Sequence, residues 1–281
     1  LGQGVLSMAL ANFDSWLRSP RTILMLLFIA AICYLQMCGY EMKLTETGYT
    51  MHLGETLFYE FKFGCNMPMT TVLFLIMVSE LPRRIAYQQY SLIRSSRCRW
   101  MAAQLLYCLM MVVAMIALIA LFIALMALPL VTHGNGWSDA ARIASGEIEP
   151  YEALISEFIL NNYTPFTATL LAMIPVFCFW LTMVFVILMF GVWGSPVFGV
   201  LMYAFLMVAN VTILFEAFPF QLILPIQYAT LDNIISSYDG KEIQQFLKVM
   251  GVYAALIVSL VAVMMISVKR VELNFHAESK Q

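Results

Sequence analysis

The densest group of side chains that could do chemistry lies over residues 80–100, ELPRRIAYQQYSLIRSSRCRW. Five arginines share this stretch with apolar residues at helical spacing. Pro82 near its start suits the first turn of a helix, where a missing N–H costs nothing. A short basic helix of this kind either binds anionic lipid headgroups or docks a partner protein. The residues themselves leave both uses open.

Motifs for catalysis and nucleotide binding do not occur in the sequence. It has no G-x-x-x-x-G-K-[ST] phosphate loop, no H-E-x-x-H zinc motif and no G-x-S-x-G nucleophile motif. His52, His133 and His276 lie far apart, and the six cysteines form no C-x-x-C pair. We therefore expect no catalytic residue, no metal site and no cofactor in this chain, and we expect that it is not an enzyme.

Ionisable side chains are almost missing from the long apolar runs. Glu60, Glu80 and Glu216 lie near the ends of such runs, and Asn210 is one of the few polar residues nearer the middle of one. Ion-driven carriers, and channels with charged rings, normally place acids or bases inside the membrane. Their lack disfavours a self-powered carrier. Asn210 either forms a helix–helix hydrogen bond or touches a substrate.

These residues must be positioned by a chain that lipid solvates. Of the 281 residues, 62% are hydrophobic and 11% are charged, whereas soluble domains have roughly 45–50% and 25%. A bilayer core needs about 20 apolar residues per helix. We therefore expect an all-α integral membrane protein, a single transmembrane domain over 1–281. Its six predicted transmembrane helices cover 22–38, 57–79, 101–128, 166–190, 197–215 and 250–268.

Charge asymmetry predicts the orientation of these helices. With both termini in the cytoplasm, ten basic residues fall on the inner side and five on the outer side, as the positive-inside rule requires. Thirteen of the 17 acidic residues then fall outside. Trp16, Trp100 and Trp193 lie near the inner membrane interface, which indole rings prefer. The expected location is a cell membrane, crossed several times.

Three segments outside the spans complete the predicted layout. Apolar residues recur at helical spacing over 6–20, which predicts an interfacial helix on the inner membrane surface; an unstructured tail is the alternative. The apolar core of 216–240 is too short to span and is broken by two prolines, which favours a re-entrant hairpin. The loop 129–165 is long and acidic, and we expect an extracellular cap there. Cys38 and Cys65 can pair if their loop faces an oxidising side.

Three stretches carry a likeness to a known family. They are NFDSWLRSPRTILMLLF over 12–28, ELPRRIAYQQYSLIRSSRCRWMAAQLL over 80–106, and a proline-broken hairpin before a last span that ends in VKRVEL. Together they resemble the membrane (permease) subunit of bacterial ABC transporters of the type-two exporter family. The likeness covers nearly the whole chain as topology. The acidic loop between the third and fourth spans departs from the family pattern.

The resemblance implies partners and roles for particular residues. The segment 80–100 would be a coupling loop whose helix docks in an ATP-binding cassette ATPase subunit, and ATP and Mg²⁺ would be bound by that partner. A second membrane subunit, the same or a homologous chain, would complete the transporter. The residues assigned to ATPase coupling are Glu80, Pro82, Arg83, Arg84, Tyr87, Gln88, Tyr90 and Arg94. Those of an outer gate are Phe218, Phe220 and Pro225, and those of the translocation path are Phe74, Phe205 and Asn210.

The expected function is therefore the transmembrane subunit of an ATP-driven ABC exporter. The chain holds 21 Met and 20 Phe, and Met-rich surfaces adapt to varied apolar ligands. We expect an amphipathic or hydrophobic cargo, such as a peptide antibiotic, a drug or a lipid-linked molecule. Membrane lipid is a further expected partner and nucleic acid is not. The alternative is a non-transporting membrane anchor or sensor subunit of a signalling complex; an intramembrane enzyme is a third option.

Overall fold

The structure is a computed structural model. It describes residues 2–47, 51–62, 66–82, 96–129, 131–132, 134, 136–139, 141, 157–211, 229, 231, 234 and 242–270.

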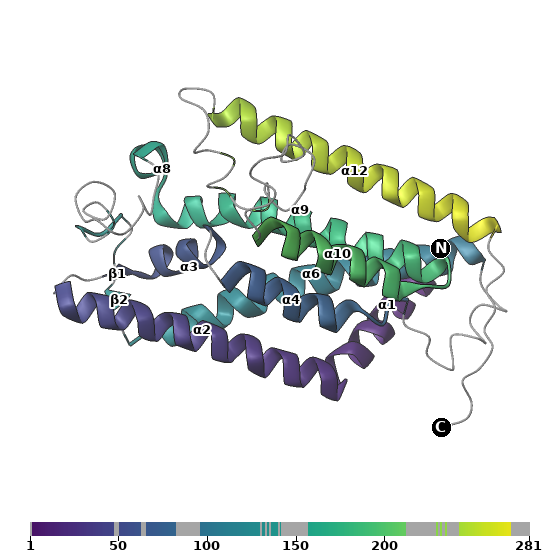
Figure 1. Cartoon of the computed structure of the whole chain (residues 1–281), viewed down its shortest axis with the longest axis horizontal. Coiled ribbons are helices and arrows are strands. Elements are labelled where there is room, and N and C mark those ends of the chain that lie inside the picture. The colour runs from purple at the N-terminus through teal and green to yellow at the C-terminus, as the bar shows by residue number, and fades with distance from the viewer. Residues whose placement is uncertain are drawn as a thin grey trace.

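Helices make up most of the described chain. In order they are α1 (Gly2–Leu17), α2 (Pro20–Thr47), α3 (Leu53–Lys62), α4 (Asn66–Val78), α6 (Arg97–Ala127), α8 (Glu157–Asn162), α9 (Pro165–Val192), α10 (Pro196–Val211) and α12 (Glu242–Arg270). The strands β1 (Met51–His52) and β2 (Val131–Thr132) pair in parallel. The long helices run side by side, with α1 at one end and β1, β2 and α8 at the other (Figure 1). We call these the α1 end and the β1 end.

Four described helices are long and apolar enough to cross a membrane, and they coincide with four of the six predicted spans. They are Pro20–Cys38 of α2, Arg97–Ala127, Pro165–Val192 and Glu242–Lys269. The N-cap residues Ser96 and Thr164 start two of them, because each side chain accepts a hydrogen bond from a backbone N–H of the first turn. These helices confirm the membrane class that composition predicts.

The predicted span over 57–79 is not one described helix. It is divided between α3, which ends at Lys62, and α4, which begins at Asn66. Pro68 lies in the first turn of α4, where proline is tolerated; in the interior of a continuous helix it would remove a hydrogen bond. Neither helix alone has the length of a membrane span. The predicted six spans are therefore not confirmed as such.

The remaining predicted segments are described only in part. Within 197–215, α10 contributes a short apolar stretch, Pro196–Phe205. The predicted hairpin over 216–240 falls almost entirely outside the described residues. The loop 129–165 contains β2 and α8, and much of its acidic part also falls outside them.

Two contacts show how the helices alternate in direction. Arg21 Nη1 lies 2.8 Å from Glu80 Oε1, which brings the start of α2 beside the residues that follow α4. Arg97 Nη1 donates to the backbone oxygen of Lys269 at 3.4 Å, which brings the start of α6 beside the end of α12. The first membrane-length helix, α2, therefore begins at the α1 end, and the last one, α12, ends there.

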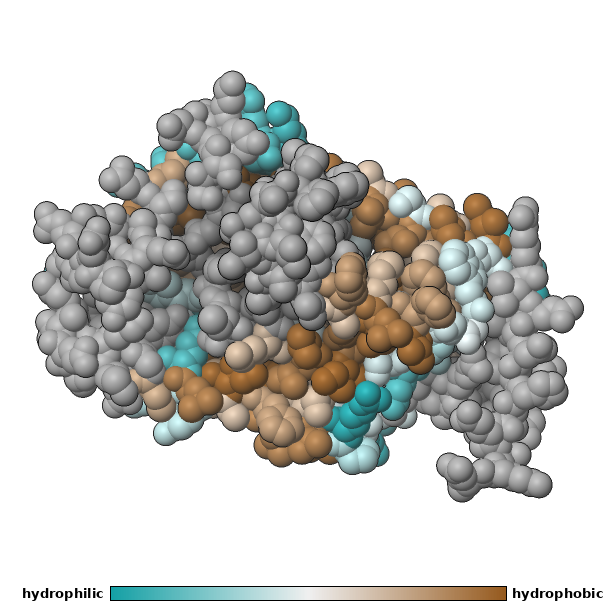
Figure 2. Space-filling view, viewed as in Figure 1, coloured by the Kyte–Doolittle hydropathy of each residue, from teal (hydrophilic) through white to brown (hydrophobic). Residues whose placement is uncertain are grey.

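The helix α9 lies in the middle of the bundle, packed against α3, α6, α10 and α12. Of its apolar window 67% is buried inside the protein, against 17% for α12. Every residue from Phe179 to Leu188 is buried, as expected for a helix with neighbours on all sides. The outer helices expose apolar side chains instead. Figure 2 shows such side chains gathered along the middle of one face, where lipid would cover them.

The helix predicted near the N-terminus forms as α1, and one of its faces is buried in the protein. Ala9, Asn12 and Trp16 are buried, while Leu6 and Leu10 are 50% and 46% exposed. The reason is that α1 packs against α6 as well as running beside the bundle. Its leucines therefore point away from the protein, and its tryptophan points into it.

Two of the three tryptophans expected at the lipid interface lie inside the helix packing. Trp16 and Trp100 are each 2% exposed, whereas Trp193 is 50% exposed. All three belong to elements at the α1 end. Trp16 and Trp100 are buried because α1 and the start of α6 cover each other.

Candidate functional site

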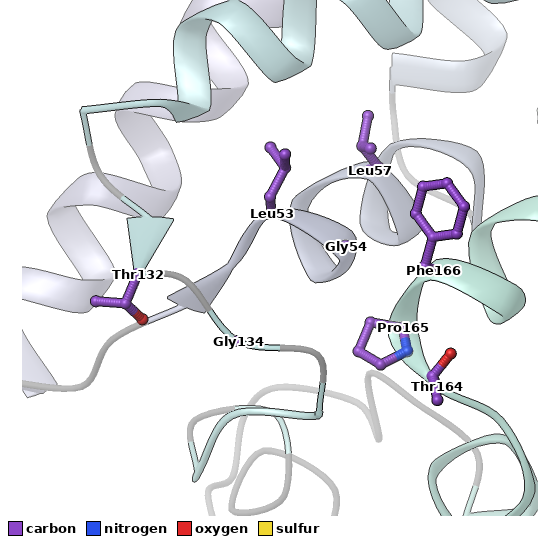
Figure 3. Close-up of a pocket in the computed structure, with 8 residues that line it drawn as sticks. All are labelled: Leu53, Gly54, Leu57, Thr132, Gly134, Thr164, Pro165 and Phe166. Carbon is purple, nitrogen blue, oxygen red and sulfur yellow. The ribbon is translucent and has the colours of Figure 1, made fainter.

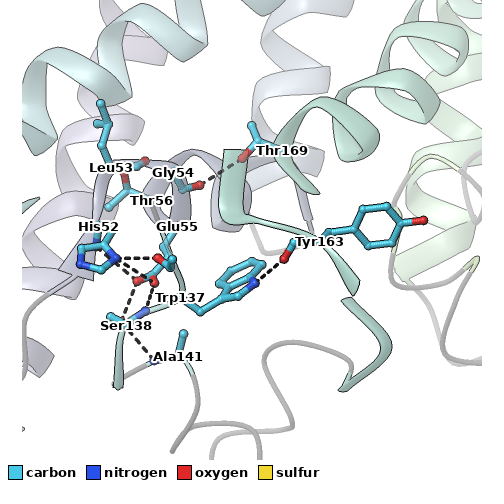
Figure 4. A network of polar contacts seen from close by, with 11 residues as sticks. His52, Leu53, Gly54, Glu55, Thr56, Trp137, Ser138, Ala141, Tyr163 and Thr169 are labelled. Carbon is cyan, nitrogen blue, oxygen red and sulfur yellow. Dashed lines mark hydrogen bonds and ion pairs between the residues drawn. The ribbon is translucent and has the colours of Figure 1, made fainter. Parts of the chain in front are cut away.

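Glu55 gathers the polar contacts of the β1 end (Figure 4). Its fully buried carboxylate accepts hydrogen bonds from the Ser138 hydroxyl at 2.8 Å, from the Ser138 backbone N–H, and from the His52 backbone N–H at 3.3 Å. Glu55 is the third residue of α3, so its bond back to His52 is one half of a capping box. Three donors therefore compensate for burying this side chain.

His52, Glu55 and Ser138 are the residue types of a hydrolase triad, but their geometry differs from one. In a triad the imidazole receives the serine proton and the carboxylate orients the imidazole. Here the Ser138 hydroxyl donates directly to Glu55, and His52 Nδ1 lies 2.6 Å from the Gly136 oxygen and 3.8 Å from Glu55 Oε1. These contacts hold residues 136–139 against α3 and pair no nucleophile with a base.

Further contacts join this network to α9. Trp137 Nε1 donates to the Tyr163 oxygen at 2.7 Å, and the Trp137 ring meets Phe58 edge-on with 5.5 Å between centroids. The Thr169 hydroxyl of α9 donates to the Gly54 oxygen at 3.0 Å. The start of α3, the residues after β2 and the start of α9 thus form one packed unit.

A pocket of about 510 Å³ opens beside this unit (Figure 3). Its lining comprises apolar side chains, two hydroxyls and two glycines: Leu53, Leu57, Pro165, Phe166, Thr132, Thr164, Gly54 and Gly134. None of the described residues that line it carries a charge. Such a pocket suits an apolar or amphipathic group that makes few hydrogen bonds.

At the α1 end, the structure describes contacts made by the first and the last residues of the predicted coupling segment. Glu80, whose side chain is 57% exposed, pairs with Arg21. Leu81 and Pro82 are buried against Gly191, where an added Cβ would overlap both residues. On the far side of the segment, the Ser96 hydroxyl accepts a hydrogen bond from the Arg99 N–H at 3.4 Å and starts α6.

The structure describes the side chains of two of the three residues predicted for a translocation path. Phe74 is buried in the helix packing, with its ring centroid 5.1 Å from that of Trp180. Phe205 is 67% exposed on α10. Asn210 belongs to α10, but its side chain lies outside the described part of the chain.

The other predicted site residues lie outside the described residues altogether. They are Arg83, Arg84, Tyr87, Gln88, Tyr90 and Arg94 of the coupling segment, and Phe218, Phe220 and Pro225 of the outer gate. Cys65 does as well, so its pairing with Cys38 stays a prediction.

Sequence reasoning missed the network around Glu55. The available signal was a glutamate three residues after a helix N-cap, which predicts the bond to His52. Nothing in the sequence indicates that Ser138, 83 residues later, supplies two more donors to the same carboxylate.

No protein-family model matches this chain, and no curated protein or solved structure matches it either. Among the described residues, no group of three or more His, Cys, Asp or Glu side chains is arranged to hold a metal ion.

Proposed function

We propose that this chain is the transmembrane subunit of an ATP-driven ABC exporter, with ATP bound and hydrolysed by a separate ATPase subunit. The supporting observation is the arginine-rich segment that begins after Pro82 and ends before Ser96. Leu81 and Pro82, just before it, are packed on Gly191 of α9, and Ser96, just after it, is the N-cap of α6. A partner that moves this segment would act directly on two membrane-length helices.

The contacts around the segment support a lever mechanism. Glu80 links the end of α4 to α2 through Arg21, and Leu81–Pro82 lie against α9. Packed helices transmit displacement because close-packed interiors do not deform continuously. ATP binding would close the ATPase subunits and move the segment, and the helices would then repack between inward-open and outward-open arrangements.

The proposed topology has six passes with both termini in the cytoplasm. The α3–α4 pair and α10 supply the two passes beyond the four membrane-length helices, and 216–240 forms a re-entrant hairpin. The α1 end is the cytoplasmic side, in keeping with the exposed Arg18, Arg97 and Arg99 there and the positive-inside rule. A second membrane subunit completes the path, and the membrane is a bacterial cytoplasmic membrane.

The proposed cargo is amphipathic or hydrophobic. The uncharged pocket at the β1 end supports this choice, because its apolar walls and two hydroxyls suit a group of that kind. The second candidate function is a membrane sensor or anchor subunit. It is favoured by the same end of the bundle, where Glu55, Ser138 and Trp137 tie a loop firmly to α3 and α9.

The decisive test is copurification. Affinity purification of the tagged chain from native membranes at mild salt is expected to bring down a nucleotide-binding ATPase. Recovery of no such protein, with the chain itself intact, would contradict the exporter proposal and favour the sensor or anchor.

A charge-reversal variant tests the coupling segment itself. Arg83→Glu with Arg84→Glu is expected to uncouple substrate-stimulated ATP hydrolysis from transport while leaving membrane insertion unchanged. Arg18→Glu is the matched control, because Arg18 is 79% exposed at the same end and forms an ion pair with Asp14, four residues away. Unchanged transport in the double variant would show that this segment is not the lever.

A further inference from the structure

The pocket at the β1 end lies between three elements that are fixed to one another (Figure 3). Gly54 lets α3 approach the start of α9 closely, since an added Cβ would lie 2.9 Å from Pro165 Cβ. The Thr169 hydroxyl donates to the Gly54 oxygen across the same contact at 3.0 Å. The residues after β2 are held on α3 by the hydrogen bond from Ser138 to Glu55. The pocket is therefore formed by contacts within the chain, as ligand pockets usually are.

The inner and outer parts of this pocket differ in polarity. Leu57 is 8% exposed and Pro165 is buried, so its inner wall is apolar. Thr164 is exposed at the mouth, where its hydroxyl accepts a hydrogen bond from the Thr167 N–H at 3.4 Å. The Thr164 proton can point to Thr167 Oγ1, 3.0 Å away, or to an acceptor atom of a ligand. A fitting ligand is apolar inside the pocket and has an oxygen acceptor at the mouth.

The position of α9 places the pocket at the membrane boundary. Its 28 residues rise about 42 Å, which is about the thickness of a bilayer with its headgroups. The first turn of α9, and the pocket beside it, therefore lie at headgroup level. Phe166, Leu170 and Ile174 follow at every fourth residue of α9 and are 62%, 51% and 43% exposed. They form an apolar stripe from the edge of the pocket into the hydrocarbon region, where membrane lipid covers it.

The charges around the pocket favour an uncharged headgroup. None of the described residues that line it carries a charge. Glu55 follows Gly54 in the chain, and its carboxylate is fully buried with donors of its own. An anionic headgroup would approach this carboxylate without a cation in the described lining to compensate. A cationic headgroup would leave water for a wall whose nearby carboxylate is covered. Both cost free energy that an uncharged headgroup does not.

We propose that the pocket binds an uncharged membrane lipid of the diacylglycerol type. Its hydroxyl or ester oxygen accepts a hydrogen bond from Thr164, and one acyl chain lies against Leu57 and Pro165. The other chain follows the stripe that starts at Phe166. The bound lipid would thus join the start of α3 to the start of α9. This site requires only that the chain lies in a membrane, so it stands apart from the exporter proposal.

Photocrosslinking tests the site in the whole chain, in phosphatidylcholine nanodiscs that contain diacylglycerol with a diazirine in one acyl chain. Mass spectrometry is expected to find cross-links at the start of α3 and the start of α9. Leu53→Trp should reduce them about tenfold, because the indole takes up the space of the acyl chain. Leu121→Trp is the matched control, since Leu121 is 50% exposed on α6, and it should leave the cross-links unchanged. Undiminished cross-links in Leu53→Trp would overturn the proposal.

Competition in the unsubstituted chain keeps the test decisive should Leu53→Trp fail to fold, as judged by size-exclusion chromatography. Excess unlabelled diacylglycerol is expected to suppress the cross-links at the pocket, and the same amount of anionic phosphatidylglycerol is not. Equal suppression by both lipids would overturn the preference for an uncharged headgroup. Suppression by neither would mean unspecific lipid contact and would overturn the site. No ATPase takes part in these measurements, so their outcome is separate from the copurification result.

Discussion

At the β1 end, the side chain of Glu55 joins separate segments of the chain. Glu55 is a fully buried carboxylate near the ends of two membrane-length helices, and it is stabilised by donors from two separate segments. Hydrogen bonds to a charged group are each worth about 1.5–3 kcal/mol, more than neutral ones. Glu55 therefore holds the loop after β2 on α3, together with the contact of the Trp137 ring with Phe58.

Substitution of Glu55 should loosen that loop. Glu55→Gln replaces one acceptor oxygen with an NH₂ group that faces donors, so we expect a loss of about 1–3 kcal/mol. Ser138→Ala should cost less, about 1 kcal/mol, because Glu55 keeps its backbone donors. Both losses of stability can be measured by thermal unfolding in detergent, monitored by tryptophan fluorescence. Trp137, which belongs to the network, is a local reporter. Melting profiles identical to the parent for both variants would show that the network does not hold the loop.

At the scale of elements, the end of α9 and the residues after α4 are in unusually close contact. Gly191 allows this approach because it has no Cβ; one placed there would overlap the Leu81 oxygen and the Pro82 ring. Leu81 and Pro82 belong to the start of the predicted coupling segment 80–100. Their position is thus set by how closely α9 can approach the α4 terminus.

Adding one methyl group at this contact should separate the two elements. Gly191→Ala is expected to destabilise the chain by about 1–3 kcal/mol, as overpacking of a close contact does. Gly251→Ala in α12 is the matched control, because nothing lies within 4 Å of its added Cβ. That change should be neutral or stabilising by up to about 1 kcal/mol, since alanine favours the helix. Equal melting temperatures for the two variants would contradict the close contact.

At the scale of the whole molecule, the two ends of the bundle differ in chemistry. The α1 end has exposed arginines and the residues on either side of the basic segment, Pro82 and Ser96. The β1 end has the Glu55 network and an uncharged pocket. Between them, helices α2 and α12 leave most of their apolar windows unburied. This division into two polar ends and an apolar middle is what a bilayer requires of a protein that crosses it.

Cysteine labelling tests the proposed orientation. Asp139→Cys, exposed at the β1 end, should react with a membrane-impermeant maleimide in intact cells. Lys269→Cys, exposed at the α1 end, should react only after permeabilisation. The unsubstituted chain controls for the six native cysteines. The reverse pattern would place the basic segment outside the cell and remove it from any cytoplasmic ATPase.

The sequence by itself determined the membrane class and four of the spans. Length and apolar composition are enough for that, because a bilayer demands about 20 apolar residues whatever their neighbours are. It did not separate 57–79 into α3 and α4, although Pro68 and the charges of Glu60 and Lys62 lie within that stretch. Hydropathy summed over a window does not register a break in the backbone.

Which face of each helix is buried was decided only by the tertiary structure. In water a helix buries its apolar face, but in lipid both the covered and the exposed faces are apolar, so periodicity carries little information. Hence Trp16 lies in the packing, while Leu6 and Leu10 of the same helix are exposed. Ser138 bonds to Glu55, and Pro82 packs against Gly191; both contacts join residues far apart in sequence. Such pairs depend on the close approach of helices in space, which no local pattern of residue types encodes.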